Sequence, residues 1–148
     1  MIRAEVEMVG TSMNNNAPVV ILKGKDENKG ILPIGIGLME AYAIHLGLDN
    51  KETPRPLTHE LLSNILTNFE IEVVQVEVTA LKNQTFYGAI KLKQSEETKV
   101  IDSRSSDAIA LALRKDVPIF IEEEVAEESF VYGDAHEYVD QLNFEEHF

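Results

Sequence analysis

Apolar and charged side chains alternate along the start of the chain, from Ile2 to Met8. A period of two is typical of a strand with one face in a core, so a half-buried strand is expected here. Apolar runs at 19–23 and 31–34, separated by turn and loop residues, predict a second and a third strand. Residues 40–48 then have a helical pattern. The first third of the chain is therefore predicted to form three strands followed by a helix.

The later part of the chain begins with a second helix, for which Thr58 is a suitable N-cap. Five apolar residues after it are spaced to share one helix face: Leu61, Leu62, Ile65, Leu66 and Phe69. A β-branched strand follows, with a slip at 73–74 that predicts a bulge. The elements expected from there on are strands over 71–80, 86–93, 99–103 and 118–121 and a helix from Ser106 to about Lys115.

The chain also repeats itself at a spacing of 67 residues. Ten pairs of chemically similar residues align at this spacing without a gap, and nine of them are identical, among them Glu5/Glu72, Val6/Val73, Asn16/Asn83, Ala41/Ala108 and Leu46/Leu113. The pattern predicts an α+β fold made from a duplicated β-β-β-α unit, roughly residues 2–50 and 69–117. The two units are expected to form a pseudo-symmetric mixed or antiparallel sheet, or a half-barrel, with helices packed on it. Glu40 and Asp107 then occupy equivalent helix starts.

Length and composition narrow the class of protein. The 148 residues suit one domain with a real core, here predicted over 1–128, followed by an acidic, aromatic-containing C-terminal extension over 129–148. No segment approaches the roughly 20 apolar residues of a membrane span, and the N-terminus has a strand pattern rather than that of a signal peptide. The absence of cysteine excludes disulfides and thiolate metal sites, and a cytoplasmic location is the default expectation.

The formal net charge of −13 argues against broad, non-specific binding of nucleic acid, which needs lysine and arginine over a wide surface. Much of the acidity lies in the last quarter of the chain, so a small, metal-assisted phosphate site remains compatible with it. Gly35 and Gly37 precede Glu40 rather than a third glycine, and no phosphate-binding loop, nucleophile elbow or paired-histidine zinc motif occurs. Neither a nucleotide nor an organic cofactor is therefore expected.

The most informative stretch of the sequence runs from Val100 to Arg114. It predicts a strand that brings Asp102 and Arg104 to a tight turn, after which Ser105, Ser106 and Asp107 start an Ala/Leu-rich helix. Two interpretations stay open. The serines and Asp107 can be helix caps with an ordinary ion pair to Arg104, or the cluster can hold a metal ion or a phosphate.

A second candidate is the segment Pro54-Arg55-Pro56-Leu57-Thr58-His59-Glu60. A residue before proline favours extended backbone, so Arg55 is held on a stiff strap before the helix. An arginine fork with a nearby histidine can grip a phosphate and move a proton. The alternative is that Arg55 pairs with an acid and His59 is a surface residue.

These stretches resemble the bifunctional nuclease domain family. The resemblance covers residues 1–128 and rests on the segments 31–37 with Glu40 and Ala41, 54–62, 81–87 and 102–112. Three positions depart from the family pattern: Gly35 stands where Trp is frequent, Asn83 where Asp is usual, and Ser106 where the pattern has Pro. The resemblance implies an α+β fold built from a duplicated β-rich unit, and it takes its name from plant members credited with both RNase and DNase activity.

The resemblance implies a nuclease that hydrolyses phosphodiester bonds of DNA or RNA with little sequence preference. In that hypothesis Asp102, Asp107 and Glu40 hold Mg²⁺ or Mn²⁺, with His59, Arg55, Arg104 and Asp107 as catalytic residues and Thr58, Ser105 and Ser106 as substrate-binding residues. The alternatives are a non-catalytic module that binds a ligand or partner with the same fold, and a structural role in a homo-oligomer. A partner for the acidic tail is a further expectation, and no membrane association is expected.

Overall fold

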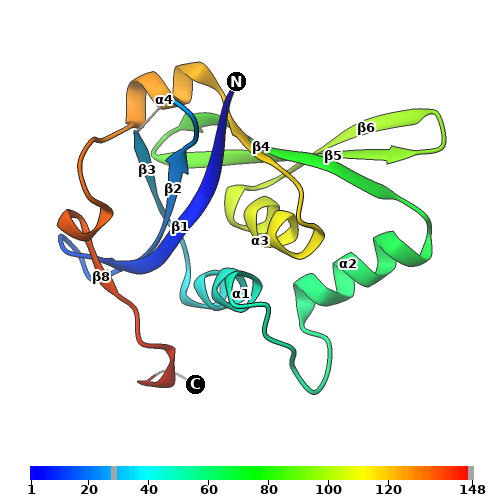
Figure 1. The fold of residues 1–148 in the computed structure, drawn as a ribbon, viewed down its shortest axis with the longest axis horizontal. Coiled ribbons are helices and arrows are strands. Elements are labelled where there is room, and N and C mark those ends of the chain that lie inside the picture. Colours follow the sequence, from blue (N-terminus) through cyan, green and yellow to red (C-terminus); the bar gives the residue numbers. More distant parts are fainter. Residues whose placement is uncertain (28–29, 147–148) are drawn as a thin grey trace.

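The computed structural model describes residues 1–27 and 30–146, and Figure 1 shows the course of the chain. The elements along it are β1 (Ile2–Ser12), β2 (Pro18–Gly24), β3 (Ile31–Gly35), α1 (Leu38–Leu48), α2 (Thr58–Asn68), β4 (Glu72–Lys82), β5 (Thr85–Gln94), β6 (Glu97–Arg104), α3 (Ser105–Lys115), β7 (Ile119–Ile121), α4 (Glu123–Ser129) and β8 (Val139–Gln141), with short 3₁₀ turns at Ala135–Glu137 and Phe144–Glu146. The fold is α+β, as predicted. No helix in the described part of the chain has the length and apolar character needed to span a membrane.

The strands form one open mixed sheet in the order β3-β2-β1-β7-β4-β5-β6, with β8 paired to β1. All of the pairs between these strands are antiparallel except β4 with β7, which is parallel. The strand order is symmetric about the short central strand β7. Of the two sheet forms expected from the sequence, the open sheet is the one observed.

The two halves of the fold correspond at the spacing found in the sequence. Helices α1 and α3 begin at Leu38 and Ser105, which are 67 residues apart, and each is 11 residues long. A register shift follows Val6 in β1 and another follows Val73 in β4, where the bulge was predicted. The same spacing joins Asn16 and Asn83, which have φ of 57° and 50° in the turns that follow these two strands.

Helix α3 is the central helix of the core. Its residues Ala108, Ile109, Ala110, Leu111 and Ala112 are all buried, because α3 contacts β4 and β5 on one side and both α1 and α2 on the other (Figure 1). The small alanines allow these neighbours to approach closely. The starts of α1, α2 and α3 are thereby held together.

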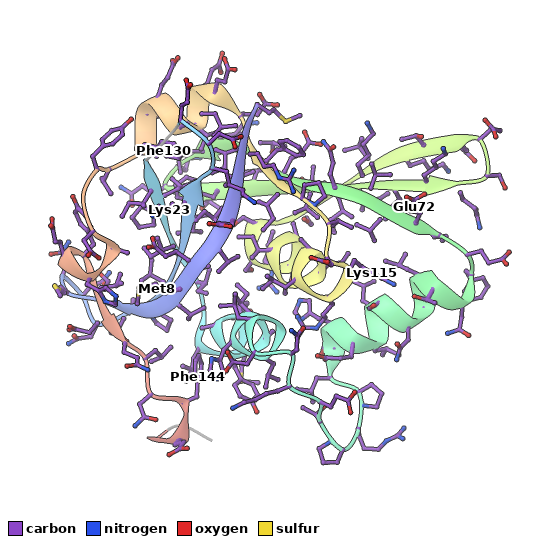
Figure 2. The ribbon with its side chains drawn as sticks, viewed as in Figure 1. Met8, Lys23, Glu72, Lys115, Phe130 and Phe144 are labelled. Carbon is purple, nitrogen blue, oxygen red and sulfur yellow. The ribbon has the colours of Figure 1, made fainter. Side chains whose placement is uncertain are left out.

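The predicted apolar face of α2 is only partly correct. Leu66 is buried and Leu62 packs against the core, whereas Leu61, Ile65 and Phe69 are 53%, 46% and 68% exposed. The five apolar residues are spread over more of the helix circumference than one neighbouring helix and one strand can cover. The middle and the last turn of α2 are tied to α3, since Lys115 Nζ donates to the carbonyl oxygen of Ser63 and to Oγ1 of Thr67. Lys115 is labelled in Figure 2.

The predictions of helix caps are wrong. Helix α2 has Leu57 as its N-cap and Thr58 as its first residue, and α3 begins one residue earlier than predicted, with Arg104 as its N-cap. Neither helix has a side-chain hydrogen bond at its cap within the described residues. The carboxylate of Asp107, which was a candidate cap, is bonded instead to side chains of other elements.

The C-terminal extension packs on the body of the protein. Ala135 and Val139 join Val19, Ile21 and Ile31 in a second hydrophobic cluster, which we call the tail cluster. Farther along, the ring of Phe144 stacks on His45 of α1 with 4.5 Å between ring centroids (Figure 2). The segment after α4 therefore contributes to the folded structure rather than projecting from it.

Candidate functional site

The candidate site centres on Arg104, at the junction of β6 and α3. Its Nε donates to Oδ2 of Asp107 at 2.8 Å, its Nη2 to Oδ1 of Asp107 at 3.1 Å, and its Nη1 to Oε1 of Glu40 at 2.9 Å. The two acids are the third residues of α3 and α1, the equivalent positions of the two halves. One guanidinium therefore joins the starts of both helices.

Helix α2 adds a histidine to this cluster. The Nε2 atom of His59 lies 2.9 Å from Oδ1 of Asp107, and the two side chains are 12% and 27% exposed. Asp107 thus bonds both to an imidazole and, through two hydrogen bonds, to a guanidinium. A carboxylate that bonds to an imidazole nitrogen fixes the orientation of the ring and its tautomer.

The network sets the charge of Asp107 and Arg104. Burial raises the pKa of the Asp107 carboxyl, but hydrogen bonds from Arg104 and then His59 outweigh it, and the pKa lies below its ordinary value of 3.8. Hydrogen bonds to Asp107 and then Glu40 raise the pKa of Arg104 above its ordinary value. At neutral pH Asp107 is therefore an anion and Arg104 a cation.

Two glycines permit this geometry. A Cβ at Gly88 of β5 would lie 2.9 Å from the Cα of Ser105, so glycine allows β5 to press against the start of α3. A Cβ at Gly37 would meet Oε2 of Glu40, whose side chain folds back over the start of α1. A side chain at Gly88 would therefore push against the backbone at the start of α3, whereas one at Gly37 would displace only the carboxylate of Glu40 from its present position.

Arg114 joins α1, α2 and α3, the three helices that carry Glu40, His59 and Asp107. Its Nε donates to Oε1 of Glu60 on α2 at 2.9 Å, its Nη2 to the carbonyl oxygen of Ala43 on α1 at 2.8 Å, and its Nη1 to the carbonyl oxygen of Ala110 on α3 at 2.8 Å. The Arg114 side chain is 8% exposed. Through Glu60, which follows His59 in the chain, Arg114 fixes the position of His59 over α3.

Two hollows meet at the Arg104–Glu40 pair. The first, which we call the histidine cleft, has a volume of about 460 Å³ and is lined by His59, Thr58, Leu57, Leu61, Met39 and Asp107, among others. The second, which we call the α3 pocket, has a volume of about 480 Å³ and is lined by Gly35, Gln84, Thr85, Phe86, Ser105 and Ser106, among others. Glu40 and Arg104 line both hollows, so the ion pair is the wall between them.

The structure brings together four of the residues selected from the sequence, namely Glu40, His59, Arg104 and Asp107. Thr58 lines the histidine cleft with them, whereas Ser105 and Ser106 line the α3 pocket.

Two other selected residues lie outside this group. Arg55 is exposed, and its carbonyl oxygen accepts a hydrogen bond from Oγ1 of Thr53. Asp102 is exposed on β6 opposite Ala89. Neither lines either hollow.

Sequence reasoning missed Glu60 and Arg114. Arg114 lies in the last turn of the Ala/Leu-rich helix, where a basic residue is ordinarily expected to be exposed. Its burial depends on α1 and α2, which lie far from it in the sequence. The available signal was a pair of basic residues, Arg114 and Lys115, directly after the small and apolar stretch of the helix.

The carboxylates do not fit a divalent cation as they are arranged. The guanidinium of Arg104 lies between Glu40 and Asp107, and no described residue contributes to a group of three or more histidine, aspartate or glutamate side chains that could hold a metal. The expected third ligand, Asp102, is not part of the cluster. The guanidinium of Arg104 therefore occupies the position between the two carboxylates that a metal ion would need.

Comparison with known proteins gives consistent matches. The bifunctional nuclease domain matches residues 20–132. An uncharacterised protein of Mycobacterium tuberculosis is 36% identical over 123 residues, which cover 82% of this chain and 73% of that protein. Bifunctional nuclease 1 of Oryza sativa subsp. japonica is 27% identical over 119 residues, and bifunctional nuclease 2 of Arabidopsis thaliana is 26% identical over 122 residues. The alignments span 36% and 37% of the length of these two plant proteins.

Proposed function

This chain belongs to the bifunctional nuclease domain family, and on that basis we propose that it hydrolyses phosphodiester bonds of DNA or RNA in the histidine cleft. The observation that carries the proposal is the continuous network from His59 through Asp107 to Arg104 at the wall of that cleft. It places a group that can move a proton beside a group that can hold a phosphate.

His59 is the proposed general base. With its Nε2–H donating to Asp107, the other ring nitrogen, Nδ1, carries the free lone pair. This nitrogen takes a proton from a water molecule as the water oxygen attacks phosphorus, and the bond from phosphorus to the leaving oxygen breaks. The imidazolium formed is stabilised by the anionic Asp107, and its proton is returned to the leaving oxygen or to solvent.

Arg104 is the proposed phosphate ligand. A guanidinium has five N–H groups, and the hydrogen bonds to Asp107 and Glu40 use three of them. The side chain is 64% exposed, so the remaining two N–H groups can donate to phosphate oxygens while both acids stay bonded. Charge-assisted hydrogen bonds of this kind stabilise negative charge that develops on the phosphate during hydrolysis.

A non-catalytic binding module is the second candidate, and one observation favours it. Arg104 is bonded to two carboxylates of the same chain, so the cluster is stable without a ligand. In this alternative the histidine cleft holds a ligand or partner, and His59 donates a hydrogen bond to it without taking part in chemistry.

A cleavage assay separates the two candidates. End-labelled single-stranded DNA, double-stranded DNA and RNA are incubated with the purified protein in Mg²⁺, in Mn²⁺ and in EDTA. The variants are His59→Gln and a matched control, His45→Gln, since His45 also pairs with an aspartate, Asp49, at 3.4 Å but lies outside the cleft. Loss of general-base catalysis is expected to slow cleavage by about 10²–10⁴-fold in His59→Gln and to leave His45→Gln close to the parent protein.

Each result of this assay has a defined meaning. Cleavage that is equal in the parent protein and in His59→Gln comes from a contaminant or another site and contradicts the proposal. Binding without cleavage supports the second candidate. Cleavage in EDTA is the result expected if the side chains described above act alone, whereas cleavage that requires Mg²⁺ or Mn²⁺ contradicts a mechanism that uses these side chains alone.

A further inference from the structure

The start of α3 is polar, enclosed and without a side-chain cap. The first N–H groups of any α-helix lack partners within the helix, and no side chain caps those of α3 within the described residues. Asp107, which is in the first turn, is held away by His59 and Arg104. The start of this 11-residue helix therefore keeps its partial positive charge facing the α3 pocket.

Two serine hydroxyls in this pocket supply an independent observation. Ser105 and Ser106 are 5% and 7% exposed, and both line the α3 pocket. Neither Oγ is hydrogen-bonded to another residue in the part of the chain that the structure describes, and neither is among the fully enclosed polar atoms that lack a partner. Both hydroxyls are therefore open to the pocket, although almost all of the surface of these residues is covered. Polar groups of residues as covered as these ordinarily have a hydrogen-bond partner, so the two hydroxyls are available to a ligand that enters the pocket.

The other walls of the pocket suit an anion of limited size. Arg104 and Glu40 neutralise each other at the boundary with the histidine cleft. Gln84 of the β4–β5 turn contributes an amide and Thr85, the first residue of β5, contributes a hydroxyl, and both can donate hydrogen bonds. Within the described residues, Glu40 is the only acidic side chain that lines the pocket, and its charge is offset by Arg104. The donors are of the kind that holds phosphate at a helix start.

We propose that the α3 pocket binds a phosphate group of a nucleic-acid chain, next to the phosphodiester group that lies at His59. Because Arg104 lines both hollows, its guanidinium can contact a phosphate on either side. A chain that crosses this wall has one phosphate in the histidine cleft and a neighbouring phosphate at Ser105 and Ser106. The inference rests on the proposed function for the identity of the ligand as a nucleic acid, whereas the phosphate site itself is tested without catalysis.

The probe is a thymidine dinucleotide with an uncharged methylphosphonate linkage, which lacks the ordinary phosphodiester group. It is prepared with a 5′ phosphate, with a 3′ phosphate and with neither, and binding to the full-length protein is measured by isothermal titration calorimetry. Inorganic phosphate is titrated as a separate ligand. A terminal phosphate at one end of the probe is expected to strengthen binding by about tenfold or more, since hydrogen bonds to a charged group are among the strong ones.

Two variants block the pocket in different ways. Ser105→Ala with Ser106→Ala removes the hydroxyls, and Gly35→Trp fills the space without changing a polar group. A Cβ at Gly35 meets nothing within 4 Å, so a side chain there extends into open space, and Gly35→Ala is the matched control. The gain from the terminal phosphate is expected to disappear in the double serine variant and in Gly35→Trp and to persist in Gly35→Ala. Thermal unfolding checks that each variant is folded.

Three outcomes overturn the inference. The first is an equal affinity for all three dinucleotides, and the second is a phosphate gain that survives in Gly35→Trp. The third is binding of inorganic phosphate as tight as that of the phosphorylated dinucleotide, which means that the pocket recognises the free ion. Because the probe has no ordinary phosphodiester group, these results are independent of the His59-dependent cleavage assay, and either proposal can fail alone.

Discussion

Replacement of Arg114 by methionine tests the link between helix packing and the site. Methionine retains an unbranched, flexible stem of similar length and removes the guanidinium. The substitution deletes the hydrogen bonds to Glu60, Ala43 and Ala110, which join α2, α1 and α3. It also leaves the carboxylate of Glu60 without its cation, and the Oε2 atom of that carboxylate is already buried with no hydrogen-bond partner among the described residues.

The expected loss of stability follows from the burial of the two partners. Breaking a fully buried ion pair by removal of one partner costs about 3–5 kcal/mol. The Glu60 side chain is 28% exposed, so water can replace part of the lost interaction, and we expect a cost of about 2–3 kcal/mol. For a chain of this length that corresponds to a fall of roughly 5–10 °C in unfolding temperature. The added substitution Glu60→Gln removes the unpaired charge and is expected to recover about 1 kcal/mol.

Urea unfolding followed by circular dichroism gives the free energies for the parent protein, the two single variants and the double variant. Lys115→Met is the matched control, because Lys115 is the next residue of α3 and also bonds to α2, through the carbonyl oxygen of Ser63. Its loss is expected to cost less than about 1 kcal/mol. The reasoning is refuted if Arg114→Met costs no more than this control, or if Glu60→Gln brings no recovery in the Arg114→Met background.

Three further predictions concern other parts of the molecule. Burial raises the pKa of Asp107, but hydrogen bonds from Arg104 and His59 lower it below its ordinary 3.8. The ionised Asp107 therefore stabilises the fold above pH 3.8, and this contribution is lost as the pH falls through the pKa of the folded state. Asp107→Asn should therefore flatten the acid limb of unfolding free energy against pH, and an unchanged limb contradicts this. Gln84→Gly should raise the unfolding free energy by about 0.5–1 kcal/mol, because Gln84 has a φ of 64° in the β4–β5 turn, and a loss of stability in urea unfolding is the contrary result. Truncation after Glu128 removes the cover of the tail cluster and should lower the unfolding temperature and increase binding of a hydrophobic dye, whereas unchanged dye binding and melting count against a structural role of the extension.

The regular elements could be predicted because their patterns are local. Alternation and short apolar runs located β1 to β7, and the slip at 73–74 located a bulge that is present in β4. Strand β8 (Val139–Gln141), in the acidic extension, was not predicted. The 67-residue repeat predicted a relation between residues that are distant in the sequence, which local patterns cannot do. It made Glu40 and Asp107 equivalent, and the structure shows both bound to the same guanidinium.

The errors arose where distant partners compete with local ones. Asp107 was a reasonable cap, but it bonds to His59, which is 48 residues away in the sequence. Arg104 reaches Glu40, 64 residues away. Arg55 and Asp102 were selected because they are near other candidates in sequence, yet the loop before α2 and the exposed strand β6 leave them outside both hollows. The spacing of residues along the sequence does not predict which of these distant side chains come into contact.

The place of β7 in the sheet has a consequence for the order of events during synthesis. Strands β1 and β4 each form a hairpin with the strand that follows it, so each half can begin to assemble from nearby residues. Among the strand pairs of the described residues, the two hairpins are joined only through β7 (Ile119–Ile121), which pairs with both β1 and β4. A nascent chain whose residues 119–121 are still inside the ribosome exit tunnel therefore has two hairpins that are not yet joined, with the edges of β1 and β4 unpaired. We expect such stalled chains to aggregate and to acquire their final structure only after residue 121 is free.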